Sequence, residues 1–320
     1  MAAGPPDSDG LTLVVGEALV DVVVSPDGTV AEHVGGSPAN VALGLARLGH
    51  GVELATHIGL DPYGVRVREH LERDGVRLSA GSTIAERTST ATARVDDAGV
   101  ATYDFDITWD LPEELGPGAA THLHMGSIAT ALPPGSDQVR RLVGLARAGA
   151  TISYDPNMRP VLLRDAHHER PGIEQLVALS DLVKASDEDV DWLYPGDTVD
   201  EVLARWAGLG PSMAVVTLGG DGARALVGGE FVTVPSRRVD VVDTVGAGDS
   251  FMAALISGLL DADLLGGPAG RLALADAAPA AVRPALERAV LVAAITCSRA
   301  GADPPYRSEL EPPPVLGIDR

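Results

Sequence analysis

A short segment near the C-terminal end combines glycines with a carboxylate in a way that suits phosphoryl chemistry: Gly246-Ala247-Gly248-Asp249. The backbone N–H groups of these four residues can converge on an anion if a helix starts here, because a helix N-terminus carries partial positive charge. A carboxylate beside an anion site repels the anion, but it fits a general base that deprotonates an attacking hydroxyl. Asp249 is therefore the candidate base, and Gly246, Ala247 and Gly248 form the candidate cradle for the transferred group.

The flanking residues predict the elements that must hold this turn. A β-branched run, 239–242, precedes it and an apolar small-residue run, 252–260, follows it, which together indicate a strand, a tight turn and a helix. A glycine-rich turn before a helix is often only a connection, and an acidic residue there can simply stabilise the helix N-terminus. A second segment, Gly35-Gly36-Ser37-Pro38-Ala39-Asn40-Val41-Ala42, favours the chemical interpretation.

The two segments together resemble the two signatures of the ribokinase-like (PfkB) carbohydrate kinase family, in the family's order and over nearly the whole chain. The resemblance implies an ATP-dependent sugar kinase with Mg²⁺ as cofactor, a candidate K⁺ site at Asp243, and a small β-lid over the sugar. Neither a GxxxxGK[ST] loop nor the glycine loop of protein kinases occurs in the sequence.

Within this resemblance, the sugar-binding positions fall on five residues and a lid aromatic: Asp21, Gly35, Gly36, Asn40, Arg159 and Phe105. Asn40 brings a donor and an acceptor to a polyol, although Pro38 alone could explain a helix entry at this point. Arg159 can clamp a phosphate, and a surface ion pair with Asp155 is the alternative. Phe105 and Tyr103 are expected to lie on opposite faces of their strand.

The nucleotide-binding positions implied by the resemblance follow two predicted strands. Thr217, Gly219, Gly220 and Gly222 match a segment beside the ATP phosphates, and a plain hairpin loop is the alternative. Gly248 would also contact the nucleotide. Ser186 and Asp189 replace the family's Asn-x-x-Glu, so Ser186 becomes a nucleotide contact and Asp189 an indirect Mg²⁺ ligand. A helix N-cap accounts for the same two residues.

Composition excludes several function classes. A net charge of −21 argues against nucleic acid or an anionic membrane as partner. The single cysteine, Cys297, excludes an internal disulfide and fits a reducing cytoplasm. No apolar run is long enough to cross a membrane, and the acidic start lacks an export signal. Lys184 is the one lysine among 24 basic residues, a bias that by itself says little about function.

Strand and helix patterns alternate along most of the chain, which predicts a doubly wound, mostly parallel α/β sheet with helices on both faces. Residues 11–24 are expected to form one strand and its continuation. We expect a disordered start at 1–10, a single domain over 11–303 and a Pro-rich tail at 304–320. The hairpins within 17–34 and 86–110 do not fit a parallel sheet and are assigned to the lid, through which a homodimer is expected.

The predicted activity is transfer of the ATP γ-phosphoryl group to a primary hydroxyl of a monosaccharide. The opening Gly16-Glu17-Ala18-Leu19-Val20-Asp21 and the segment Asp155-Pro156-Asn157-Met158-Arg159 resemble fructokinases more than ribokinases, so fructose is the first substrate. 2-Keto-3-deoxygluconate and ribose are the alternatives. A non-catalytic sugar sensor is a different class, against which the intact Asp249 argues. A Rossmann dehydrogenase is excluded because Gly16 does not begin a GxGxxG segment.

Overall fold

The computed structural model describes residues 10–96 and 101–310. Among these residues, nine strands form the main sheet, in the spatial order β13-β12-β11-β10-β9-β8-β1-β4-β5. All neighbours from β11 to β5 are parallel, and only β12 and β13 run antiparallel at one edge. The bounds are β1 Leu11–Val15, β4 Val52–Ala55, β5 Arg77–Leu78, β8 Ala120–Gly126, β9 Thr151–Asp155, β10 Leu182–Ser186, β11 Met213–Thr217, β12 Ala223–Val227 and β13 Glu230–Val234.

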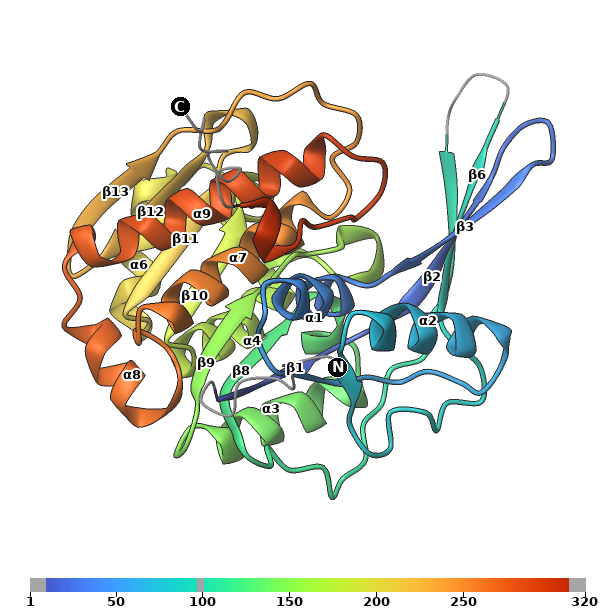
Figure 1. The fold of residues 1–320 in the computed structure, drawn as a ribbon, viewed down its shortest axis with the longest axis horizontal. Helices are drawn as coiled ribbons and strands as arrows, with labels where there is room; N and C mark the ends of the chain where they lie inside the picture. The colour runs from blue at the N-terminus through green and yellow to red at the C-terminus, as the bar shows by residue number, and fades with distance from the viewer. Residues whose placement is uncertain (1–9, 97–100, 311–320) are drawn as a thin grey trace, which may run out of the picture.

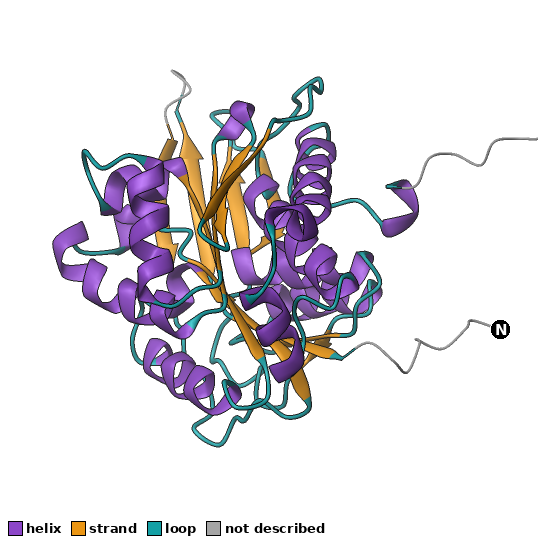
Figure 2. Cartoon of the chain, turned by 90° about the vertical axis from the view of Figure 1, so that its left-hand side faces the viewer, coloured by secondary structure: helices purple, strands orange, loops and turns teal. Residues whose placement is uncertain are grey.

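Helices cover both faces of the main sheet (Figure 2), as the alternating pattern predicts. One apolar cluster joins the sheet to α1, α2, α7 and α9, and another joins its other face to α3, α4, α5 and α6. The bounds are α1 Ser37–Arg47, α2 Pro62–Arg73, α3 Gly135–Ala146, α4 Ala166–Leu179, α5 Asp187–Leu193, α6 Val199–Leu209, α7 Ala247–Asp261, α8 Gly267–Ala275 and α9 Pro279–Cys297, with 3₁₀ turns at η1 Ser127–Thr130, η2 Pro160–Leu162, η3 Gly219–Asp221 and η4 Arg307–Glu309.

A second sheet of four described strands, ordered β3-β2-β6-β7, projects from the body as an arm (Figure 1). Its bounds are β2 Leu19–Val24, β3 Val30–Gly35, β6 Thr90–Val95 and β7 Ala101–Asp106. Two hairpins therefore form this arm, hereafter the lid sheet, and β2 pairs with β6 in parallel. One face carries Val20, Val22 and Val34, which pack against the body. The opposite face stays open.

The structure corrects two predicted strands. Residues 11–24 are divided between two sheets, because the chain leaves the main sheet at Gly16. There the backbone passes so close to α1 that a Cβ at Gly16 would lie 2.2 Å from the Pro38 ring. Residues 239–242 form an exposed loop, in which Val241 and Val242 are each 64% exposed. No strand of the described chain pairs with this loop. The backbone N–H of Val242 instead donates to the carbonyl of Cys297 at the end of α9.

The described part of the predicted tail packs on the body. Arg47 of α1 donates to the carbonyl of Pro304 at 2.7 Å, and Arg307 of η4 forms an ion pair with Asp261 at 2.9 Å. Residues 1–9 of the predicted disordered start at 1–10, the lid turn at 97–100 and the tail beyond 310 lie outside the described residues. Within the described part of the chain, no helix is both long and apolar enough to cross a membrane.

Candidate active site

The candidate residues gather at the carboxyl edge of the main sheet, where ligands of open α/β sheets bind. The parallel register places Ser186, the last residue of β10, beside Thr217, the last of β11, and it places Gly126 beside Asp155 at the ends of β8 and β9. Helix α7 begins at this edge, so its first turn meets these strand ends. The sequence segments that predicted chemistry are therefore brought to one place.

Asp249 is the centre of the site. It lies in the first turn of α7, is 7% exposed, and accepts three side-chain hydrogen bonds. Ser37 Oγ donates to Oδ1 at 2.7 Å, Asn40 Nδ2 to Oδ2 at 2.8 Å, and Asn157 Nδ2 to Oδ1 at 3.3 Å. These donors orient the carboxylate and compensate for its burial. The structure places Ser37 and Asn40 inside the first turn of α1.

The turn before Asp249 has the geometry of a helix-start anion cradle. Gly246 is the N-cap of α7 in the left-handed conformation, with φ of 74°. A side chain there would also collide with the backbone of Ala302, since a Cβ would lie 2.8 Å from its Cα. The first intrahelical bond runs from Ser250 N–H to the Gly246 carbonyl. The N–H of Ala247 donates to the Thr244 carbonyl at 3.2 Å. The N–H groups of Gly248 and Asp249 also precede the first intrahelical bond, and they point out of the helix start.

The glycines of the first motif make room for neighbouring backbone and for Asp21. A Cβ at Gly35 would lie 2.1 Å from Asp21 Oδ2, and a Cβ at Gly36 would lie 2.5 Å from the Glu17 carbonyl oxygen. Asp21 is partly buried in β2, and burial raises its pKa, while the charges of His33 and Arg159 act in the opposite direction. Asp21 and both glycines therefore line one corner of the site.

The lid register places Phe105 on the same face as Asp21. Asp21 pairs with Ala91, and Ala91 pairs with Phe105, so the three side chains form one cross-strand row on the open face. The prediction that Tyr103 and Phe105 lie on opposite faces is wrong. Residues two apart in a strand share a face, and the two rings stack with centroids 6.1 Å apart.

Arg159 does not pair with Asp155. Its guanidinium donates to Asn157 Oδ1 at 2.7 Å and to the Asn157 carbonyl at 3.1 Å, so it orients the same Asn157 that contacts Asp249. Asp155 is completely buried and forms an ion pair with Lys184, whose Nζ lies 3.0 Å from Oδ2. The predicted alternative for Arg159, an ion pair with Asp155, is therefore wrong.

Both predicted nucleotide segments lie at the sheet edge, and both also have the simple structural role that the sequence allowed. Thr217 ends β11, and the three glycines form the turn to β12, where Gly222 has φ of 99°. Ser186 and Asp189 form a capping box at the start of α5. Asp189 Oδ1 also accepts the N–H of Met158 at 2.8 Å, so each carboxylate oxygen already has a protein donor.

A metal cage made of protein side chains is absent from residues 10–96 and 101–310: no group of three or more His, Cys, Asp and Glu residues there could hold an ion. The saturated carboxylate of Asp189 fits Mg²⁺ held mainly by nucleotide phosphates and water, which is the usual coordination of this ion in kinases. Asp243 closes the loop before α7, since its carboxylate accepts N–H groups from Val245 at 3.0 Å and Gly301 at 2.8 Å.

Comparison with known proteins identifies the family of this chain. The family model described as "pfkB family carbohydrate kinase" matches residues 10–309. The chain belongs to the pfkB family of carbohydrate kinases. A fructokinase from Klebsiella pneumoniae is 37% identical over 264 residues, which cover 78% of this chain and 85% of that protein. The resemblance predicted from the two signatures, and the sugar kinase class that it implied, are thus confirmed.

Solved structures place this pfkB kinase in the ribokinase-like fold. A fructokinase from Xylella fastidiosa with bound ATP superposes with a TM-score of 0.78 at 23% identity, and the match covers 91% of this chain and 93% of that chain. A fructokinase double mutant from Vibrio cholerae O395, bound to fructose, ADP and potassium ion, gives 0.74 at 25% identity, with coverages of 92% and 95%. The predicted fold class is confirmed.

Sequence reasoning gave no role to four polar residues that the structure places in or beside the candidate site: Ser37, Asn157, Glu17 and Lys184. Ser37 and Asn157 lie inside segments that the sequence analysis quoted, but it gave them no role. Glu17 is buried beside Ser127 and Ala129, and burial raises the pKa of its carboxyl group to about 7. A carboxylate or lysine within an apolar strand pattern was the available signal, since such residues are rarely buried without a partner.

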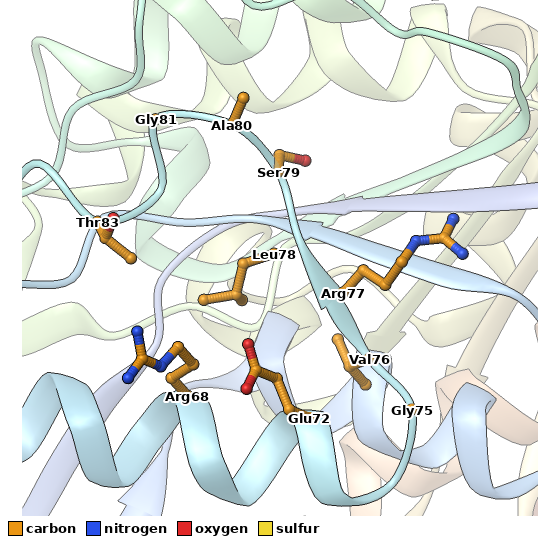
Figure 3. A pocket seen from close by; sticks show the side chains of 10 residues that line it. All are labelled: Arg68, Glu72, Gly75, Val76, Arg77, Leu78, Ser79, Ala80, Gly81 and Thr83. Atoms are coloured by element: carbon orange, nitrogen blue, oxygen red, sulfur yellow. The ribbon is translucent and has the colours of Figure 1, made fainter.

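A separate surface pocket of about 540 Å³ opens beside the edge strand β5, away from this site (Figure 3). Arg68 and Glu72 of α2 line one side, and the segment from Gly75 to Gly81 lines the other. None of the predicted site residues borders it. The pfkB kinase therefore has its candidate chemistry at the carboxyl edge of the sheet and not in this pocket.

Proposed function

We propose that this chain transfers the γ-phosphoryl group of ATP to a primary hydroxyl of a monosaccharide, and that the monosaccharide is fructose. The observation that carries the proposal is the constellation around Asp249. A carboxylate held by Ser37, Asn40 and Asn157 stands in the same helix turn as the Gly246–Gly248 cradle. A base and an anion site so close together suit an acceptor hydroxyl that attacks a bound phosphoryl group.

In the proposed step, Asp249 accepts the proton of the sugar hydroxyl while the hydroxyl oxygen forms a bond to the γ-phosphorus. The bond between that phosphorus and the β–γ bridging oxygen breaks, and the electron pair leaves on ADP. The N–H groups of Gly246, Ala247, Gly248 and Asp249 stabilise the charge on the transferred group. The sugar hydroxyls are bound by Asp21, Gly35, Gly36 and Asn40. Phe105 covers the sugar, and Arg159 orients the part of the site that holds the acceptor hydroxyl.

The nucleotide is proposed to lie across the ends of β10 and β11. Ser186, Thr217, Gly219, Gly220 and Gly222 contact it there, since their backbone and hydroxyl groups line this edge of the sheet. A Mg²⁺ ion held by the phosphates would neutralise part of their charge, and Asp189 would contact it through water. Asp243 is the candidate for organising a K⁺ ion, because it fixes the loop that leads into the cradle.

Fructose follows from the relatives named fructokinase and from the shared motif residues. A coupled ADP-release assay with about twenty sugars tests it. We expect fructose to give the highest kcat/KM, ahead of 2-keto-3-deoxygluconate and ribose. If another sugar is preferred, fructose is replaced as the substrate and the kinase assignment stands. If the protein binds ATP and sugar but turns over none of the tested sugars, a sugar sensor on the same fold is favoured.

The open face of the lid sheet supports a homodimer. Beyond the row that contains Asp21 and Phe105, the next row on the same face is apolar: Ala31, Val23, Ala93 and Tyr103. Tyr103 is 61% exposed, and an exposed apolar sheet face favours association. The row that contains Asp21 and Phe105 is free to cover the sugar. The apolar row that contains Tyr103 meets the lid sheet of a second chain. Lid closure would then exclude water from the reacting phosphoryl group.

Sedimentation at micromolar protein checks the dimer. The native chain is expected to sediment as a dimer and the Tyr103→Asp variant as a monomer, because a charge would be buried at the centre of the contact. Leu272→Asp, on the exposed surface of α8 at 69% exposure, is the matched control and should stay dimeric. A fully active native monomer would refute the dimer and leave lid closure over the sugar open.

A further inference from the structure

The one lysine of this chain lies beneath the candidate anion cradle. Lys184 is in β10, its side chain is 3% exposed, and its Nζ pairs with the fully buried Asp155 at 3.0 Å. Every other strongly basic residue of the 320 is arginine. Burying an ion pair costs free energy that the attraction between the charges often fails to recover. This position therefore calls for a reason other than stability.

The pair is not arranged for maximal stability. The second oxygen of Asp155, Oδ1, is buried without a hydrogen-bond partner in the described structure. The ammonium group has three donors, and the bond to Asp155 occupies one of them. A pair that served only to hold β9 and β10 together would be expected to satisfy both carboxylate oxygens.

Lys184 lies directly against the cradle. A Cβ built on Gly248 would stand 3.1 Å from Nζ, so this glycine is the point at which the ammonium and the start of α7 meet. The compact ammonium fits this space, whereas a planar guanidinium needs more room. The charge of Lys184 thus stands beside the N–H groups that are proposed to bind the transferred group.

The three carboxylates around Lys184 explain why a cation is needed here. Asp155, Asp189 and Asp249 all act on Lys184, and a phosphoryl group arriving among three carboxylates would be repelled. Burial alone would lower the pKa of Lys184, but these carboxylates raise it above its ordinary value, so the ammonium stays charged. Lys184 is therefore a permanent positive charge in an otherwise acidic cluster.

We propose that Lys184 contacts the γ-phosphoryl group during transfer and stabilises its charge, an inference that rests on the proposed kinase function. Nζ donates to a non-bridging oxygen of the group while the bond to the acceptor oxygen forms and the bond to the bridging oxygen of ADP breaks. The acceptor proton goes to Asp249. Lys184 neither gives nor takes a proton, and Asp155 is the positioning residue that holds the ammonium in place.

The double variant Lys184→Met/Asp155→Asn tests this proposal. It removes both charges together, so no unpaired charge stays buried, and both replacements are close to the native size. We expect kcat to fall by about 10²–10³-fold, as for loss of one donor to a developing anion. Calorimetry should show about tenfold weaker binding of a non-hydrolysable ATP analogue, since a charge-assisted contact to the γ-phosphate is lost. Affinities for ADP and sugar should stay the same.

Other outcomes overturn the proposal. Near-native kcat in the folded double variant would mean that Lys184 only neutralises Asp155. Equal losses of affinity for ADP and for the ATP analogue would place the lysine away from the transferred group. If the native chain binds the analogue but phosphorylates no sugar, the kinase function fails, and the contrast between ADP and the analogue still decides whether Lys184 contacts the γ-phosphate.

A matched control removes a second ion pair at the opposite end of the same strand. Asp181 precedes β10, and Arg271 of α8 pairs with it at 2.7 Å. Arg271→Met/Asp181→Asn should lower the melting temperature and keep kcat at temperatures where the protein is folded. If the control loses as much turnover as the test variant, the effect of Lys184 is structural.

Discussion

Replacement of Asp249 by Asn is expected to lower kcat by about 10²–10⁴-fold while ATP binding is nearly retained. The amide keeps the size of the carboxylate, but it cannot accept the proton of the sugar hydroxyl. Ser37, Asn40 and Asn157 all donate to the native carboxylate, so the variant retains hydrogen bonds through its carbonyl oxygen. Steady-state kinetics with the preferred sugar, together with calorimetric ATP titration, measure the two effects separately.

A control at the other end of α7 separates catalysis from helix stability. Asp261 forms ion pairs with Arg288 at 2.6 Å and Arg307 at 2.9 Å. Asp261→Asn should cost stability and leave kcat close to native, because these contacts lie a full helix length from the site. Near-normal turnover in Asp249→Asn would remove Asp249 from the role of base.

Gly248→Val is expected to abolish measurable turnover in a protein that still folds. Gly246, and not Gly248, adopts the left-handed conformation, so valine at 248 meets no backbone strain of that kind. Its Cβ would instead stand 3.1 Å from Lys184 Nζ, so the branched side chain would push the ammonium group away from the start of α7. Activity assays and thermal melting of the purified variant test both halves of the expectation.

Two further glycine variants serve as controls for Gly248→Val. Gly144 of α3 has open space around it, so Gly144→Val should leave turnover unchanged. Gly246→Ala should lower the melting temperature sharply, because the new Cβ would lie 2.8 Å from the Ala302 Cα and φ there is 74°. If Gly248→Val keeps its activity, the Gly246–Asp249 turn does not bind the transferred group.

Local patterns in the sequence were sufficient for the fold class. Alternating strand and helix patterns predicted the doubly wound sheet, and each lid hairpin was recognisable because alternation of side chains is a property of a few consecutive residues. The two glycine motifs identified the family for the same reason, since turn chemistry depends on neighbouring residues. The strand predicted at 239–242 failed because a β-branched run forms a strand only if another strand pairs with it, and none of the strands in residues 10–96 and 101–310 does.

Contacts between distant segments were decided by the tertiary structure alone. Ser37 and Asp249 are 212 residues apart in sequence, yet their side chains are 2.7 Å apart, because α1 and α7 both begin at the carboxyl edge of the sheet. The alternative considered for Arg159 was an ion pair with Asp155, four residues away, but the partner of Asp155 is Lys184 on the neighbouring strand. The sequence determined which residues can do chemistry, through their types and local spacing. Only the packing of helices on the sheet determined which of them meet, because that packing brings together segments that no local pattern connects.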